Sequence, residues 1–284
     1  MPHSFRIVNV FTVDGAPLSG NPLCVFEDAR GLTTERMQAL ARQLNLSETT
    51  FVLPPTDPET AAARVRIFTP TFEMPFAGHP TLGTAAVIAA GRARVTLEMI
   101  AGLVPVTCAG ASYTLRAAQA PVTRPAAARA DLARMLGLPA DAIADEPLWV
   151  STGVEQLVIP LTTAAHVAAA RPAPELLERW GYGTTRDEAM AYVWAPPAEP
   201  DGAWPVRFFF TAGGAVIEDP ATGSACANLG GWLVARGRPL PLTASLTQGT
   251  AVGRPSRLGL RVDADRHIHV TGEVIEVARG AFDL

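Results

Sequence analysis

Two segments that lie far apart in the chain are built alike, residues 75–86 (PFAGHPTLGTAA) and residues 218–227 (EDPATGSACA). Each follows an expected strand, passes through a turn of Gly, Pro and Thr, and enters an Ala-rich apolar helix. The first backbone N–H groups of a helix have no partner within it, so such a turn suits a carboxylate or a phosphate. One ionisable side chain stands at each turn, His79 and Asp219. The pair predicts a duplicated fold with an anionic ligand held between its halves.

The composition is that of a globular protein. Of the 284 residues, 48% are apolar and 18% are charged, and a chain of this length can bury a substantial core. The net charge of −4 argues against nucleic acid or an anionic membrane surface as a partner. Because there is no apolar run of membrane-spanning length and no signal-peptide core at the N-terminus, we expect a cytoplasmic protein.

The basic residues and the cysteines exclude several kinds of chemistry. The sequence contains no lysine, which excludes a Schiff base and a Walker-type phosphate loop. Its three cysteines have no CxxC spacing, so neither a disulfide framework nor a zinc site is expected. His267 and His269 would lie on one face of a strand, where two ligands could hold a metal, but a surface strand is the better interpretation. We therefore expect no cofactor and no metal.

The expected elements divide into two similar halves. Each half contains several strands and one Ala-rich helix that is apolar nearly all round, at about residues 81–90 and 223–236. Such a helix is usually buried, which suggests a sheet curled around it. The Ala- and Pro-rich stretch 117–128 marks the boundary, giving halves of residues 1–118 and 119–284 with a last strand that could return to the first half. The fold class is α+β. In the first half, Thr34 can cap a further helix that contains Met37, Leu40 and Leu44.

Several ordered motifs resemble those of a known family. They are GNP (20–22), LSETTFV (46–52), FTP (68–70), EMPFAGHPT (73–81), EDPATGSA (218–225), and QG (248–249) followed by GRPS (253–256). Together they resemble the phenazine-biosynthesis isomerase (PhzF-like) family, whose fold is similar to that of diaminopimelate epimerase. The resemblance implies two pseudo-symmetric halves, each a mainly antiparallel sheet around a central helix. It also implies a homodimer that acts without a cofactor on a small anionic metabolite.

Glu48 is the candidate base. It stands among small hydroxyl residues beside an apolar strand, where partial desolvation would raise the pKa of a carboxyl group and suit it to proton transfer. The local sequence alone favours a plainer interpretation, in which Ser47 and Glu48 cap or decorate a turn. The resemblance reverses that preference, because the matching Glu is the family's catalytic acid/base. We count Ser47 among the substrate-binding candidates.

The two glycine turns supply the other candidates. A helix N-terminus disfavours an imidazolium, so a neutral His79 could donate to or accept from a substrate atom. Asp before Pro at a helix start is commonly a cap, and the resemblance implies that Asp219 also contacts the substrate. Gly78, Gly223 and Ser224 would supply donors to a substrate carboxylate. A plain structural role in the turns is the alternative for each.

Three functions follow from these residues. The leading one is a cofactor-independent isomerase in which Glu48 moves a proton on a small unsaturated amino or hydroxy acid, similar to trans-2,3-dihydro-3-hydroxyanthranilate isomerase. The second is an amino-acid racemase or epimerase, which needs a base on each face. A pair of cysteines cannot supply those bases, because Cys226 lies inside the second helix and Cys24 and Cys108 lie in strands. The third is a non-catalytic metabolite-binding protein.

Overall fold

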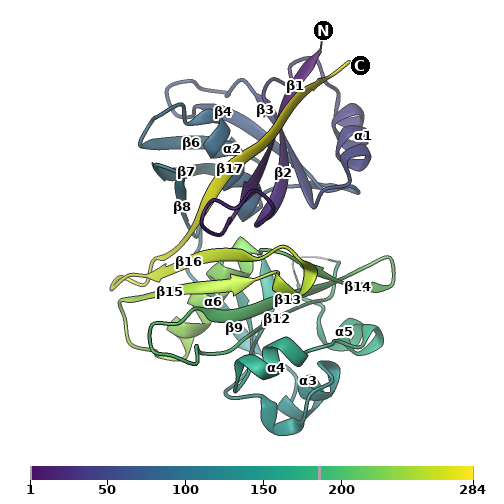
Figure 1. Ribbon diagram of the computed structural model, residues 1–284, viewed down its shortest axis with the longest axis vertical. Helices are drawn as coiled ribbons and strands as arrows, with labels where there is room; N and C mark the ends of the chain where they lie inside the picture. Colours follow the sequence, from purple (N-terminus) through teal and green to yellow (C-terminus); the bar gives the residue numbers. More distant parts are fainter. Residues whose placement is uncertain (1, 185–186, 284) are drawn as a thin grey trace. The chain divides into compact units, whose positions relative to one another are not determined.

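The computed structural model describes residues 2–184 and 187–283. The chain divides into two compact units: unit 1 is Met1–Arg116 with Thr271–Leu284, and unit 2 is Ala117–Val270. The boundary lies two residues before the end of the expected first half, and the structure assigns the last strand to unit 1 (Figure 1). Four residues of the expected halves lie outside the described residues. They are Met1, Leu284 and residues 185–186 of the expected second half.

Unit 1 is mainly strands. They are β1 (His3–Val10), β2 (Asn21–Phe26), β3 (Glu48–Leu53), β4 (Ala63–Phe68), β5 (Glu73–Met74), β6 (Arg94–Met99), β7 (Gly102–Ala109), β8 (Ser112–Arg116) and most of β17 (Ile268–Phe282), with the helices α1 (Thr34–Leu44) and α2 (Gly78–Ile88).

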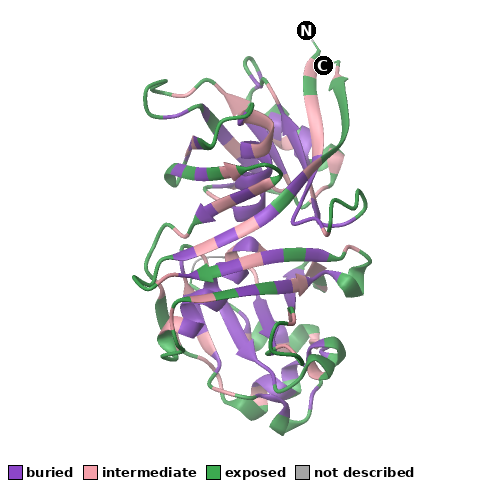
Figure 2. Cartoon of the chain, turned by 60° about the vertical axis from the view of Figure 1, so that its left-hand side comes forward, coloured by how far each residue is buried: buried purple, intermediate pink, exposed green. Residues whose placement is uncertain are grey.

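The unit 1 sheet closes on itself around α2. Hydrogen-bonded pairs lead from β17 to β1, β2, β3, β4, β6, β7 and β8, and β8 pairs again with β17. The β2–β3 and β4–β6 pairs in this ring are parallel. Figure 1 shows α2 inside the ring, with β17 running beside β1, and Figure 2 shows the exposed end of β17 beside the N-terminal strand.

Small residues allow α2 to lie inside a closed sheet. Every residue from Gly78 to Ala85 is buried. A Cβ atom placed on Gly83 would come within 2.6 Å of Leu23 on β2 and within 2.9 Å of Val10 on β1. The lack of a side chain at Gly83 therefore sets how closely the helix and the sheet approach each other.

The starts of two helices differ from their expected positions. The α1 helix is capped by Thr33, whose hydroxyl accepts from the backbone N–H of Arg36 at 3.4 Å, and Thr34, the expected cap, is its first residue. The α2 helix begins at Gly78 instead of Thr81, because proline is tolerated in a first turn, where its missing N–H costs no hydrogen bond. His79 therefore belongs to the first turn of the helix.

Unit 2 contains the remaining elements. Its strands are β9 (Val122–Pro125), β10 (Leu148–Ser151), β11 (Glu155–Pro160), β12 (Met190–Trp194), β13 (Trp204–Ala212), β14 (Ala215–Asp219), β15 (Leu242–Gln248) and β16 (Ser256–Val262), and its helices are α3 (Arg129–Met135), η1 (Ala140–Ala142), α4 (Ala164–Ala169), α5 (Pro174–Trp180), α6 (Gly223–Ala235) and η2 (Thr250–Val252).

The unit 2 sheet runs in the order β9, β10, β11, β12, β13, β15, β16, and β14 pairs with the later part of β13. The α6 helix contacts β9, β10, β11 and β16 and is buried over most of its length. Buried side chains of α3, α4 and α5 form a separate core with β11 and β12. Each unit thus contains a central buried helix, and the predicted α+β fold is confirmed.

None of the described helices is both long enough and apolar enough to cross a membrane.

The close packing of α6 predicts the effect of added volume. A Cβ atom on Gly231 would lie 2.8 Å from both Pro121 and Val150. We expect Gly231→Val to lower the free energy of unfolding by about 1–3 kcal/mol through overpacking, measured by urea unfolding. Ala235→Val is the control, because Ala235 is exposed at the end of the same helix and a surface change there should stay within about 0.5 kcal/mol. Equal losses in both variants would contradict this account of the packing.

Candidate active site

Glu48 and His79 lie together in unit 1. Glu48 is the first residue of β3, opposite Leu23 in the parallel pair with β2, and His79 is in the first turn of α2. The Nδ1 atom of His79 is 3.4 Å from Oε2 of Glu48, and their side chains are 5% and 16% exposed. The structure therefore brings together two of the residues predicted to be catalytic.

The His79 ring is neutral near physiological pH. Burial lowers the pKa of His79 to about 3, against the opposing effect of a hydrogen bond to the backbone of Pro22. A neutral imidazole keeps one N–H donor and one acceptor nitrogen. The contact with Glu48 is thus a contact between a carboxyl group and a neutral ring, and not an ion pair.

Neighbouring residues hold the Glu48–His79 pair in place. Gly20 has a φ of +78°, and a Cβ atom there would lie 2.5 Å from the carbonyl oxygen of Val10, so glycine is required where the chain turns into β2. That turn positions Pro22. The hydroxyls of Thr50 and Thr84 lie 2.8 Å apart and join β3 to α2.

The other predicted residues of unit 1 differ in accessibility. Gly78 begins α2 and is buried. The N-cap residue of α2, Ala77, makes no side-chain capping hydrogen bond. Ser47 is exposed in the bend before β3.

Asp219 is the last residue of β14 in unit 2, and its side chain stabilises the turn before α6. Its Oδ2 atom accepts from the hydroxyl of Thr222 at 2.5 Å. Buried Gln248 donates to the carbonyl oxygen of Asp219 at 2.9 Å and to the Thr222 hydroxyl at 3.0 Å, and accepts from the Thr222 N–H at 3.2 Å. The QG motif quoted from the sequence therefore fixes the shape of the second turn.

Ser224 is held by a polar network that the sequence reasoning missed. Gln156 donates to the Ser224 hydroxyl at 3.0 Å, and Asn228 donates to Gln156 at 2.8 Å while accepting from the Thr152 hydroxyl at 2.8 Å. Because Ser224 accepts from Gln156, its own O–H can still donate. The sequence feature that could have indicated this network is Asn228, a polar residue in an otherwise apolar helix. Gly223, the first residue of α6, is buried, and α6 also lacks a side-chain cap.

Two of the three cysteines are placed as expected for core residues, whereas Cys108 in β7 is only partly buried. Cys226 is 0% exposed within α6, and burial raises the pKa of its thiol. Cys24 is also buried, in β2, and burial raises the pKa of its thiol in the same way. Neither sulfur belongs to a glycine turn, and high pKa values disfavour the thiolates that a two-base cysteine mechanism needs.

One group of side chains has a spacing that would suit a metal ion. Ligand atoms of Asp263, Asp265 and His267 lie within 4.8 Å of one another. Oδ2 of Asp263 is 3.3 Å from Nδ1 of His267 and 3.3 Å from Nε2 of His269. Because the Asp263 carboxylate already contacts both His267 and His269, the arrangement is that of a cluster of polar side chains at the surface.

Comparison with known proteins identifies the class. Residues 8–280 match the PhzC-PhzF family model, described as phenazine biosynthesis-like protein, and the chain belongs to this family. It is 38% identical to an uncharacterized isomerase of Pasteurella multocida, over 98% of this chain and 93% of the relative. It is 35% identical to trans-2,3-dihydro-3-hydroxyanthranilate isomerase of Pseudomonas aeruginosa, over 92% of this chain and 91% of the relative. The chain is therefore an isomerase.

The fold is also found in a solved structure. The crystal structure of a PhzF-family phenazine biosynthesis protein of Bacillus anthracis covers 100% of this chain and is itself covered completely, with a TM-score of 0.83 at 24% identity. This likeness supports the fold.

Burial of His79 predicts a dependence of stability on pH. The unfolded chain takes up this proton near the ordinary pKa of 6.5 and the folded chain only near about 3, so the unfolded state binds more protons between these values. The stability contribution of a neutral His79 is therefore fully present above about pH 6.5 and is lost as the pH falls, by up to about 1.4 kcal/mol per pH unit. In urea unfolding at a series of pH values, His79→Asn should lose less stability on acidification than the wild type.

The matched control is His267→Asn, which removes a histidine that is 48% exposed. If the free energy of unfolding falls equally steeply with pH in the wild type and in His79→Asn, then His79 takes up a proton as readily in the folded chain as in the unfolded chain, and the prediction is wrong.

Proposed function

We propose that this isomerase moves a proton on a small, anionic, unsaturated amino or hydroxy acid, with Glu48 as the general acid/base and without a cofactor. The observation that supports this most directly is the position of the Glu48 carboxyl group, 16% exposed and 3.4 Å from the ring of a buried histidine. A carboxyl group that is mostly shielded but still accessible can exchange a proton with a bound carbon acid.

The proposed reaction needs one base. The Glu48 carboxylate removes a proton from a carbon next to a double bond and a carboxylate, and the C–H electron pair moves into the conjugated system. The Glu48 carboxylic acid then returns the proton at the other end of that system, on the same face. No electrons are gained or lost overall, and no second substrate is consumed.

His79 is proposed to bind a substrate heteroatom as a neutral ring. With a pKa of about 3, it cannot supply a proton as an imidazolium near neutral pH. The neutral ring can donate one hydrogen bond and accept one. Among the described residues, its buried Nε2 atom has no hydrogen-bond partner, and an oxygen or nitrogen of the substrate would satisfy it.

Ser47, Gly78, Asp219, Gly223 and Ser224 are proposed to contact polar groups of the substrate. The first backbone N–H groups of α2 and α6 suit a carboxylate, because both helices lack a side-chain cap and a helix N-terminus attracts negative charge. The homodimer implied by the family resemblance is part of the same proposal and can be checked by light scattering.

The name of the Pseudomonas aeruginosa relative supplies the first substrate to test. We expect the wild type to convert trans-2,3-dihydro-3-hydroxyanthranilate, followed by proton NMR in D2O, and Glu48→Gln to lower kcat by about 10²–10⁴-fold. The glutamine keeps the size of the side chain but cannot take up a proton.

Glu35→Gln is the matched control, because Glu35 is an exposed glutamate on α1. Equal turnover by Glu48→Gln would exclude Glu48 as the base. Solvent deuterium in both epimers of a product would instead indicate the two-base epimerase.

Ser224 allows a separate test of substrate binding. If its O–H donates to the substrate, Ser224→Ala should raise KM by about 5- to 10-fold, the value of one hydrogen bond, with a smaller effect on kcat. Ser245→Ala is the control, because Ser245 is exposed on β15. An unchanged KM would restrict Ser224 to a structural role in the turn.

A further inference from the structure

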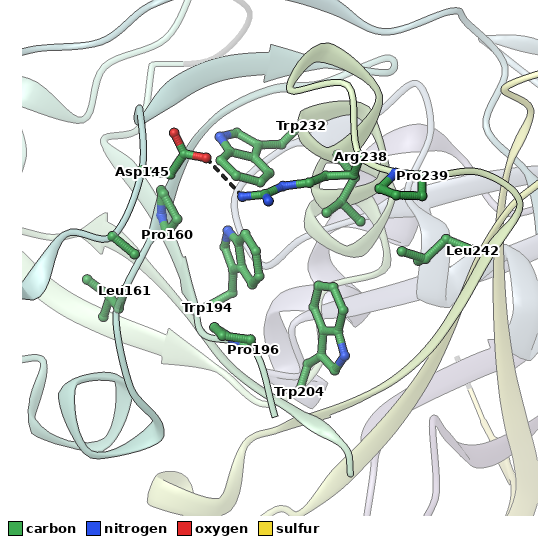
Figure 3. A pocket seen from close by; sticks show the side chains of 12 residues that line it. Asp145, Pro160, Leu161, Trp194, Pro196, Trp204, Trp232, Arg238, Pro239 and Leu242 are labelled. Carbon is green, nitrogen blue, oxygen red and sulfur yellow. Dashed lines mark hydrogen bonds and ion pairs between the residues drawn. The ribbon is translucent and has the colours of Figure 1, made fainter. Parts of the chain in front are cut away.

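Unit 2 contains a cavity whose lining includes none of the residues proposed for proton transfer. It has a volume of about 310 Å³ and is partly open to solvent. Its lining comes from the ends of β11, β12 and α6 and the starts of β13 and β15, including Pro160, Leu161, Leu242 and three tryptophans. Figure 3 shows these side chains around the cavity. The volume is at the lower end of the range for small-molecule sites, about 300–1,000 Å³.

Three indole rings form its walls. Trp194 and Trp204 are stacked, with ring centroids 5.1 Å apart and an angle of 13° between their planes. Trp232 meets Trp194 edge to face at 5.1 Å. These are three of the five tryptophans in the chain, and flat aromatic walls favour a flat ring by stacking or by edge-to-face contact.

Two of the residues that line the cavity carry a charge, Asp145 and Arg238. Asp145 accepts hydrogen bonds from Arg236 at 2.8 Å and from Arg238 at 2.9 Å. Arg236 lies outside the lining, so the one carboxylate at the cavity is shared by two guanidinium groups. Arg238 is 47% exposed, which leaves its guanidinium accessible to an anion.

Trp194 adds a hydrogen-bond donor. Its side chain is 4% exposed, and within the described residues its indole N–H has no hydrogen-bond partner. The indole N–H of Trp232, by contrast, donates to the carbonyl oxygen of Glu146 at 2.9 Å. In Figure 3 the nitrogen of Trp194 is on the side of its ring toward the Arg238 guanidinium. A buried donor without a partner is costly, and an oxygen of a ligand would satisfy it.

We propose that this cavity, the tryptophan pocket lined by Trp194, Trp204, Trp232 and Arg238, binds a small planar aromatic carboxylate. The ring of the ligand lies against the indoles, and its carboxylate faces the Arg238 guanidinium and the Trp194 N–H. This site is independent of the proposed isomerisation, because it uses neither Glu48 nor His79.

The test uses 2-naphthoate as the probe and isothermal titration calorimetry as the readout. We expect binding at one site per chain, and weaker binding of the neutral 2-naphthalenemethanol by about 5- to 10-fold, because it lacks the charge. Trp204→Ala, a change at a partly exposed wall residue, should weaken naphthoate binding by about tenfold. Arg238→Gln should remove the preference for the acid over the alcohol.

Matched controls separate this site from the proposed active site. Arg261→Gln removes an exposed arginine elsewhere in unit 2, and Trp180→Phe changes a tryptophan outside the pocket; both should bind naphthoate as the wild type does. Glu48→Gln should also bind it normally even when isomerisation is lost, so failure of one proposal is distinguishable from failure of the other.

Four outcomes would overturn the proposal. They are absence of naphthoate binding, equal binding of the alcohol by the wild type, full binding by Trp204→Ala, and binding that is lost in Ser224→Ala but not in Trp204→Ala. If naphthoate fails to bind and Trp204→Ala converts a dimer to a monomer in light scattering, the pocket receives a second copy of this chain instead.

Discussion

The enclosure of one helix by a sheet is the constraint on which the rest of the structure depends. A helix surrounded by strands can present a polar side chain along its length only where that side chain finds a hydrogen-bond partner. The α2 helix meets this constraint with small and apolar residues, among them Gly83, which touches β1 and β2 without a side chain. Polar chemistry is then possible chiefly at the first turn, where backbone N–H groups are free of the helix ladder. That is where His79 lies.

The two central helices bury their polar side chains in different ways. Asn228 in α6 is buried, but its amide contacts Thr152, Val154 and Gln156, so its polar atoms are paired. His79 is 5% exposed, and its Nε2 atom has no hydrogen-bond partner among the described residues. A complete network favours a fixed structure, whereas a buried polar atom without a partner calls for an explanation such as a catalytic role or a bound ligand. The first turn is accordingly the better candidate for the chemistry.

The sequence predicted the two central helices and their turns because both signals are local. Ala-rich apolar runs following Gly/Pro/Thr turns identified α2 and α6, and the ordered motifs identified the family. The contact between Glu48 and His79 was not local, because 31 positions separate them in the sequence and their approach depends on how β3 packs against α2. The family resemblance made both residues site candidates, but their contact was not predicted, and neither residue type nor spacing could have predicted it.

Gln156 and the tryptophan pocket illustrate the other limit of sequence reasoning. A glutamine in a strand gives no sign that it will reach Ser224, 68 positions away. Trp194, Trp204 and Trp232 lie in three different elements, and each by itself reads as an ordinary core residue. Their rings come together only because β12 pairs with β13 and α6 packs against the sheet. Because large aromatic side chains usually fill a core completely, a cavity left among three of them is better explained by a ligand than by packing alone.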